Sequence, residues 1–280
     1  MNQVNTASSH RPLRVLLAED NKVNQQFATL ILSKAGHSVE VAANGRLAVD
    51  AVERADFDVV LMDIQMPELD GVEATQEIRA LPQPKGHVPI IAVTAHAMAG
   101  AREKYLAAGM DEYISKPFQP ALLLAVIAQF SDRVPPFFSS AATGASEART
   151  DTPRLEELPV LDLKQLGTLG TVFSLPKIRT LASLYMLDVE ARLVLIDGCR
   201  ALNDFDGISR QAHMLVSTAG NLGAKQSSAL ASRLEISCGD RDAALSDRLV
   251  GELRASCALS SDAIRRWLHA AASADIAAGS

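Results

Sequence analysis

Residues 57–67 read FDVVLMDIQMP, and this stretch decides how the first half of the chain is interpreted. Positions 57–62 are apolar apart from Asp58, and they include two β-branched valines. A short, bounded apolar run of this kind indicates a strand that is buried on both faces of a sheet. The run ends at a carboxylate, Asp63, and Pro67 then interrupts regular structure. Because parallel sheets bind ligands at the carboxyl ends of their strands, Asp63 is either a functional residue or a solvated strand-end aspartate.

The composition is that of an ordinary, slightly acidic globular protein. The chain has 280 residues, enough for two domains, and 48% of them are hydrophobic, 21% are charged and the net charge is −6. No basic block suggests a nucleic-acid partner, no apolar run approaches the roughly 18 residues of a membrane span, and the polar first twelve residues do not resemble a signal peptide. Three widely spaced cysteines without a CxxC pattern indicate neither a disulfide framework nor a zinc site. We therefore expect a reduced, cytoplasmic protein without nucleic-acid or membrane partners.

Strand and helix patterns alternate five times in the first half of the chain. This alternation predicts a parallel sheet with helices on both of its faces. The expected strands are 13–18, 39–42, 57–62, 90–93 and 113–114, and the expected helices are 23–35, capped by Asn21, then 45–54, 71–80, 98–108 and 120–130.

Residues that carry chemistry follow four of these strands. Glu19 and Asp20 follow the first strand, Asp63 the third, Thr94 the fourth and Lys116 the fifth. Parallel strands end at the same edge of a sheet, so these side chains are expected to converge there. Three neighbouring carboxylates cannot all stay ionised without a counter-charge.

A magnesium ion is the expected counter-charge at this edge. Mg²⁺ suits a site made of a few carboxylates, waters and phosphate oxygens, and Lys116 adds a compact positive charge that binds phosphate. The expected ligands are Glu19, Asp20, Asp63 and the backbone carbonyl of Gln65. This arrangement favours phosphoryl transfer onto Asp63, because the cation and the amine neutralise the oxygens of the incoming group.

The first half resembles a response-regulator receiver domain. That family has an acidic pair after strand one, a phosphorylated aspartate after strand three, Thr or Ser after strand four and Lys-Pro after strand five. All four features are present, as Glu19-Asp20, Asp63, Thr94-Ala95 and Lys116-Pro117, over about residues 13–130. The resemblance implies an α/β, flavodoxin-like, doubly wound (βα)5 fold in which Asp63 accepts the phosphoryl group.

The same resemblance implies a conformational switch. Thr94 is expected to move towards the phosphate, Tyr113 to turn inward, and the face formed by the fourth helix, the fifth strand and the fifth helix to change. The Lys116-Pro117 bond is expected to be cis. Two alternative interpretations without a functional role stay open: Lys116 as a solvated lysine, and Tyr113 as a core residue. A haloacid-dehalogenase-like phosphatase would need a second aspartate where this chain has Gln65, which argues against that class.

Residues 131–160 contain prolines mixed with Ser, Ala, Thr and Gly and show no periodicity, which predicts a flexible linker. Residues 1–12 are expected to be disordered. About 28 flexible residues span roughly 30 Å, so the second domain could fold back onto Asp63.

The second half, about residues 161–275, shows helical periodicity without strand patterns. Helices are expected at 175–201, 205–219, 225–237 and 243–272, and these lengths predict an all-α four-helix bundle. In the second of these helices, apolar residues form a stripe that faces the core. His213 lies on a second line of residues along the same helix, with Ser209 one turn before it and Ser217 one turn after it. We therefore expect His213 on a solvent-facing ridge, where a neutral imidazole accepts phosphoryl groups. A buried imidazole would contradict this expectation.

The sequence motifs around His213 resemble those of a histidine-phosphotransfer (HPt) domain. The family core is His-x-Leu-Lys-Gly followed by small residues, and this chain has HMLVS at 213–217 and AGNLGA at 219–224. It departs from the family at Val216, in place of lysine, and at Ser217, in place of glycine. The first change removes a cation near the histidine, and the second puts a side chain where a receiver must approach. Glu235 or Arg233 on the next helix is expected to orient the imidazole.

Two functions follow from these patterns. In the first, a sensor histidine kinase phosphorylates Asp63, and His213 exchanges the phosphoryl group with Asp63, another receiver or another HPt protein. Such a chain is not an enzyme with its own substrate, apart from slow self-dephosphorylation. In the second, the bundle is a degenerate scaffold that is never phosphorylated, and phosphorylation of Asp63 exposes a partner surface. Val216 and Ser217 keep this alternative open.

Overall fold

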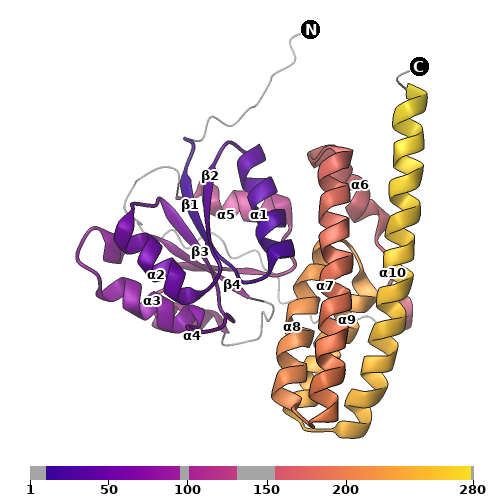
Figure 1. Cartoon of the computed structure of the whole chain (residues 1–280). Helices are drawn as coiled ribbons and strands as arrows, with labels where there is room; N and C mark the ends of the chain where they lie inside the picture. Colours follow the sequence, from indigo (N-terminus) through magenta and orange to yellow (C-terminus); the bar gives the residue numbers. More distant parts are fainter. Residues whose placement is uncertain (1–10, 95–100, 131–154, 279–280) are drawn as a thin grey trace.

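The computed structural model describes residues 11–94, 101–130 and 155–278. A sheet with its helices forms the first half, and a group of long helices forms the second (Figure 1). Disorder is expected for residues 1–12, of which residues 1–10 lie outside the described residues, as do residues 131–154 of the predicted linker. At the end of the predicted linker, residues Leu155–Glu157 form a short 3-10 helix, η2.

The sheet has five parallel strands in the order β2-β1-β3-β4-β5. In this order the direction in which successive strands are added to the sheet reverses between β1 and β3, as in a flavodoxin-like doubly wound sheet. The predicted fold class is confirmed, and the fifth strand is longer than expected. The strands are β1 (Arg14–Ala18), β2 (Ser38–Ala42), β3 (Val59–Asp63), β4 (Ile90–Thr94) and β5 (Glu112–Ser115).

Helices cover both faces of the sheet. The first face packs on α1 (Lys22–Lys34) and α5 (Pro120–Ala128), and the second on α2 (Gly45–Arg54), α3 (Gly71–Ala80) and α4 (Ala101–Ala107). Successive strand residues point to opposite faces, which explains the continuous apolar run before Asp63. In β3, for example, Leu61 belongs to the first core and Met62 to the second.

Among the described residues of the second half, four long α-helices and one short α-helix follow η2. Each of the long helices packs against two of the others, in the cycle α7–α8–α9–α10, so they form the predicted bundle. They are α7 (Leu175–Ala201), α8 (Phe205–Asn221), α9 (Lys225–Gly239) and α10 (Ala243–Ala278). In the described residues, none of the helices has the length and apolarity needed to span a membrane.

The short helix α6 (Leu163–Val172) was not predicted. Asp162 caps its first turn, and Leu166 and Leu169 are buried against the bundle. Two glycines, at 167 and 170, weaken its helical signal in the sequence. Helix α6 ends beside Phe173, which becomes important for the contact between the two halves.

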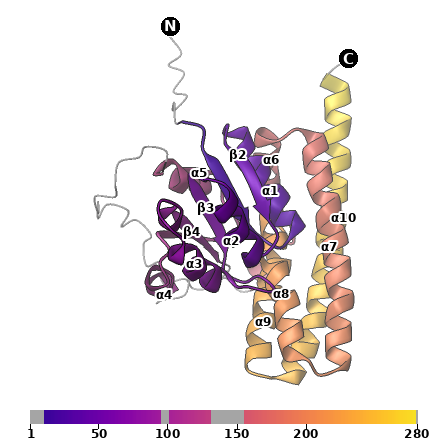
Figure 2. The ribbon, with the colours of Figure 1, turned by 60° about the vertical axis from the view of Figure 1, so that its left-hand side comes forward.

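The two halves share one apolar core. Helix α1 packs against both α7 and α8, and Figures 1 and 2 both show α1 on the side of the sheet that faces the bundle. The rings of Phe27 on α1 and Phe173 meet edge to face, with 6.4 Å between their centroids. Both rings belong to the core that runs from the first face of the sheet into the bundle. The halves are therefore packed together and not only tethered.

Candidate functional site

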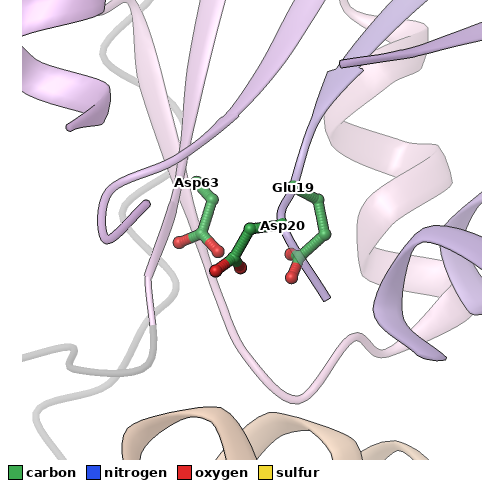
Figure 3. A group of neighbouring side chains, drawn as sticks. All are labelled: Glu19, Asp20 and Asp63. Carbon is green, nitrogen blue, oxygen red and sulfur yellow. The ribbon is translucent and has the colours of Figure 1, made fainter. Parts of the chain in front are cut away.

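The acidic residues after β1 and β3 lie together at one edge of the sheet. Strands β1 and β3 are neighbours in register from Val15 to Ala18, so the residues that follow come out side by side. Carboxylate oxygens of Glu19, Asp20 and Asp63 all lie within 4.8 Å of one another. Figure 3 shows the three side chains gathered here, with a helix in the orange of the bundle beneath them in this view.

Lys116, which follows β5, reaches the same edge. Its Nζ lies 2.7 Å from Oε2 of Glu19 and 2.5 Å from Oδ2 of Asp63, and all three side chains are buried. Burial alone would lower the pKa of Lys116, but the Asp63 and Glu19 carboxylates outweigh burial and raise it. The lysine is therefore a fixed positive charge and not a solvated one.

Burial shifts both members of the acidic pair towards the protonated form. It raises the pKa of Glu19 to about 7, against the opposing pull of Lys116. It raises the pKa of Asp20 to about 6, and the neighbouring Glu19 adds to the shift. An additional positive charge at this edge would restore both carboxylates to their ionised form.

The donor set fits a magnesium ion. Oδ1 of Asp20 is buried without a hydrogen-bond partner in the part of the chain that the structure describes. When ionised, the three carboxylates outnumber Lys116, the cation that contacts Glu19 and Asp63 directly, so a dication would balance the remaining negative charge. Gln65 lies in the loop after β3, and its N–H donates to Oδ1 of Asp63 over 3.2 Å. A metal contact from its carbonyl stays a prediction.

The loop that follows Asp63 is held close to the sheet by a glycine. Gly71 begins α3, and its N–H donates to the carbonyl of Ile64. A Cβ at this position would lie 2.0 Å from the carbonyl oxygen of Asp63, so only glycine fits without displacing the backbone. Gly71 therefore helps to set the position of Asp63.

The two predicted switch residues lie on the other side of the site. Thr94 ends β4 and is buried, with its Oγ1 3.1 Å from the hydroxyl of Tyr105 on α4. Tyr113 in β5 is half-buried and packs on the second core. Tyr105 was not predicted, because its spacing reads only as a core aromatic. The switching roles of Thr94 and Tyr113 stay predictions, and Ala95 lies outside the described residues.

The Lys116-Pro117 peptide bond is cis, as the resemblance to receivers implies. This bond directly follows Lys116, whose side chain lies at the acidic edge, and it precedes α5, which begins at Pro120.

His213 does not stand on an exposed ridge, so that prediction was wrong. Its side chain is only 7% exposed. The line that contains His213 continues to Ser217, whose Oγ accepts a hydrogen bond from Asn24 Nδ2 of the first half, so this side of α8 is where the sheet domain packs. Sequence periodicity finds the surface of the bundle but cannot reveal that another part of the chain covers it. An unrelated docking protein has no open access to His213 in this arrangement.

A carboxylate on the next helix orients the imidazole. Nδ1 of His213 lies 3.0 Å from Oε1 of Glu235 on α9. In a neutral imidazole, an Nδ1–H that donates to a carboxylate leaves the lone pair on Nε2, the nitrogen that can act as a nucleophile. Arg233, the other residue expected to orient the ring, is exposed. Of the two candidates, the geometry favours Glu235.

The two departures from the HPt pattern have different environments. Val216 is buried and packs into the shared core. Ser217 is buried at the contact with the first half, where its Oγ also donates to the carbonyl of Met214 over 3.2 Å. Ser217 therefore accommodates the approaching domain and does not block it.

Comparison with known proteins agrees with this geometry. Residues 15–128 match the response regulator receiver domain family, and residues 180–271 match the Hpt domain family. A hybrid signal transduction histidine kinase I from Dictyostelium discoideum is 47% identical over 122 residues, which is 41% of this chain and 7% of that protein. The aerobic respiration control sensor protein ArcB from Escherichia coli is 31% identical over 226 residues, 80% of this chain and 28% of that protein.

Among solved structures, the receiver domain of a sensor histidine kinase from Pseudomonas aeruginosa is 44% identical. The match covers 43% of this chain and 98% of that one, with a TM-score of 0.40. The chain spans less than a third of the length of either sensor protein named above. The two family matches are separate in sequence and coincide with the sheet domain and the helical bundle. The chain therefore combines a response-regulator receiver domain with a histidine-phosphotransfer domain.

Proposed function

We propose that this chain is a two-component phosphorelay protein in which Asp63 accepts a phosphoryl group from a sensor histidine kinase and exchanges it with His213. In this proposal the receiver covers about residues 13–130, the linker 131–160 and the HPt domain 161–275. The matched families and the sensor kinases among the relatives support the relay. The observation that carries the exchange is the packing of the helix of His213 on the receiver, next to the loop that holds Lys116.

The first step places the phosphoryl group on Asp63. A carboxylate oxygen of Asp63 attacks the phosphorus of a phosphohistidine donor, a P–O bond forms, and the P–N bond breaks with its electron pair returning to the donor imidazole. Lys116 is placed to bind an oxygen of the transferred group, since its amine already contacts Asp63. Glu19, Asp20, Asp63 and the Gln65 carbonyl would hold Mg²⁺, which supplies neutralisation of phosphate charge when bound.

The second step moves the group to the bundle. The Nε2 lone pair of His213 attacks the phosphorus, a P–N bond forms, and the P–O bond to Asp63 breaks to restore the carboxylate. The imidazole gains positive charge as the bond forms. The hydrogen bond from Nδ1–H to Glu235 stabilises that charge, because an ionised acceptor strengthens a hydrogen bond. Thr94 and Tyr113 change position when Asp63 is phosphorylated and so report its state to partner proteins. Besides the sensor histidine kinase, these partners are receivers or HPt proteins of the same relay.

A second candidate function keeps Asp63 as the acceptor and makes the bundle a scaffold that covers the receiver. The burial of His213 and the loss of the family's lysine at Val216 favour it. In that case no phosphohistidine forms on this chain, and the contact between the domains regulates access to Asp63. The two candidates therefore differ in one chemical product.

Radiolabelled phosphoryl transfer from a sensor kinase separates the two functions. Phosphohistidine is labile in acid and stable in base, whereas an acyl phosphate on aspartate is lost in base. The relay predicts base-stable label in the wild type, no label in Asp63→Asn, and only base-labile label in His213→Gln. Normal labelling of Asp63→Asn would overturn the receiver assignment. Base-labile label alone in the wild type would favour the scaffold.

A further inference from the structure

A buried network of polar side chains joins the receiver to the HPt helix α8. Nδ2 of Asn24 on α1 lies 2.9 Å from Oγ of Ser217, and its Oδ1 accepts a hydrogen bond from Nδ2 of Asn221, also at 2.9 Å. Oδ1 of Asn221 in turn accepts from the backbone N–H of Phe118 over 2.8 Å. The three polar side chains are at most 2% exposed. Each domain thus supplies hydrogen-bond partners for polar groups of the other domain that are buried at the contact.

The network also reaches the acidic edge. Nδ2 of Asn24 lies 2.9 Å from Oε1 of Glu19, so the same amide contacts the receiver site and the bundle. On α8, the polar contacts flank a glycine, Gly220. A Cβ at Gly220 would lie 2.8 Å from Cβ and Cγ of Pro117, so the helix approaches the Lys116-Pro117 loop as closely as a backbone allows. Shape and hydrogen bonding therefore match at the same place.

Ser217 stands where the HPt pattern has glycine, and this structure gives the substitution a partner. A receiver without an amide at the position of Asn24 would leave Nδ2 of Asn221 buried without its acceptor, and Oγ of Ser217 would keep only its bond to the carbonyl of Met214. Buried polar groups that lose their partners weaken an interface by roughly ten- to a hundredfold. A site built on such groups rejects partners that lack the matching group.

We propose that Ser217 and Asn221, paired with Asn24, are specificity residues that select the receiver of this same chain as the partner of His213. The partner is the chain's own receiver and not a second copy, because covalent linkage raises the local concentration of the matching surface. Further contacts extend the match beyond the network. Asn21 Nδ2 lies 3.2 Å from the Asp188 carboxylate on α7, and Phe27 packs on Phe173. This inference rests on the proposed relay for its purpose, but its test needs no phosphoryl donor.

Hydrogen exchange of the Phe118 amide measures this docking directly, because its acceptor belongs to the other domain. We expect Ser217→Ala and Asn24→Ala each to lower the protection of this amide about tenfold or more in the full chain. In the double variant, the fold-loss of protection should be smaller than the product of the losses in the two single variants, since both substitutions remove the same hydrogen bond between Asn24 and Ser217. Ser209→Ala, on the same helix, is the matched control and should keep wild-type protection. Because Ser209→Ala is the same kind of substitution on α8, it also shows whether a change in the stability of the helix alone alters the protection.

A dilution series distinguishes the chain's own receiver from a second copy. Own-chain docking predicts that protection of Phe118 is the same over a hundredfold range of protein concentration. Protection that rises with concentration would overturn the proposal in favour of a receiver from another copy. Protection within twofold of wild type in both Ser217→Ala and Asn24→Ala would also overturn it. These outcomes leave the phosphorelay itself untouched, because Asp63 and His213 are assayed separately by their labels.

Discussion

Nδ1 of His213 and Oε1 of Glu235 lie 3.0 Å apart, on two neighbouring helices of the HPt domain. The carboxylate favours a proton on Nδ1 and leaves the lone pair on Nε2, the nitrogen that acts as the nucleophile in the proposed relay. We expect Glu235→Ala to slow phosphorylation of His213 by tenfold or more, as loss of one charge-assisted hydrogen bond would. Glu235→Gln, which keeps an acceptor but loses the charge, should be intermediate. The exposed Arg233→Ala is the control. Unchanged transfer rates in Glu235→Ala would exclude the positioning role.

The acidic edge should bind Mg²⁺ through Asp20. Its Oδ1 is buried without a hydrogen-bond partner among the described residues, which makes it the carboxylate with most to gain from a cation. We expect Asp20→Asn to weaken Mg²⁺ binding by tenfold or more, because the amide supplies a neutral oxygen in place of an anion. Isothermal titration calorimetry measures the affinity. Asp50→Asn, exposed on α2, is the control. Equal affinities for Asp20→Asn and the wild type would move the metal elsewhere.

Gly71 should be required for the geometry of Asp63. A Cβ at Gly71 would lie 2.0 Å from the Asp63 carbonyl oxygen, so Gly71→Ala must displace the backbone beside the acceptor. We expect a loss of about 1–3 kcal/mol in the free energy of unfolding and slower phosphorylation of Asp63. Gly251→Ala is the contrasting control, since no neighbour lies within 4 Å of its added Cβ and helix propensity favours alanine. It should gain about 0.5–1 kcal/mol. Denaturant unfolding checks both values, and a Gly71→Ala protein as stable as wild type would contradict this reading.

The shared core should make the two domains unfold together. Phe173 is buried against Phe27 across the domain contact. We expect Phe173→Ala to cost about 3–5 kcal/mol, as large-to-small changes in cores do, and to separate unfolding into two transitions. Leu163→Ala, on the exposed side of α6, should leave stability nearly unchanged. A single unchanged transition in Phe173→Ala would show that the ring contact contributes little to coupling.

Local patterns in the sequence predicted the receiver well because its signals are local. The apolar run before Asp63 and the residues after each strand follow from strand periodicity and from the geometry of parallel sheets. Asn21 caps α1 as expected. The short helix α6 was missed, since ten residues with two glycines carry a weak periodic signal.

The length of the linker allows the second domain to fold back onto the first, but the sequence could not show which residues form the contact. The periodicity correctly predicts that the helix of His213 is amphipathic, but the prediction that its second line faces solvent is wrong. Asn24, Asn221 and Gly220 carried no signal as interface residues, because their partners lie more than a hundred positions away or in another domain. The HPt pattern predicts that the side chain of Ser217 obstructs a receiver, whereas in the structure Ser217 accepts a hydrogen bond from one. Periodicity identifies a face, and only the fold shows what packs on it.

The most direct test of the relay is the movement of one phosphoryl group within one chain. We would label Asp63 rapidly, quench the reaction at successive times, and measure base-labile and base-stable label in the wild type at two protein concentrations. The account predicts that label leaves Asp63 and appears on His213 at a rate that does not depend on concentration. Label that decays from Asp63 without any base-stable product on His213 would contradict it.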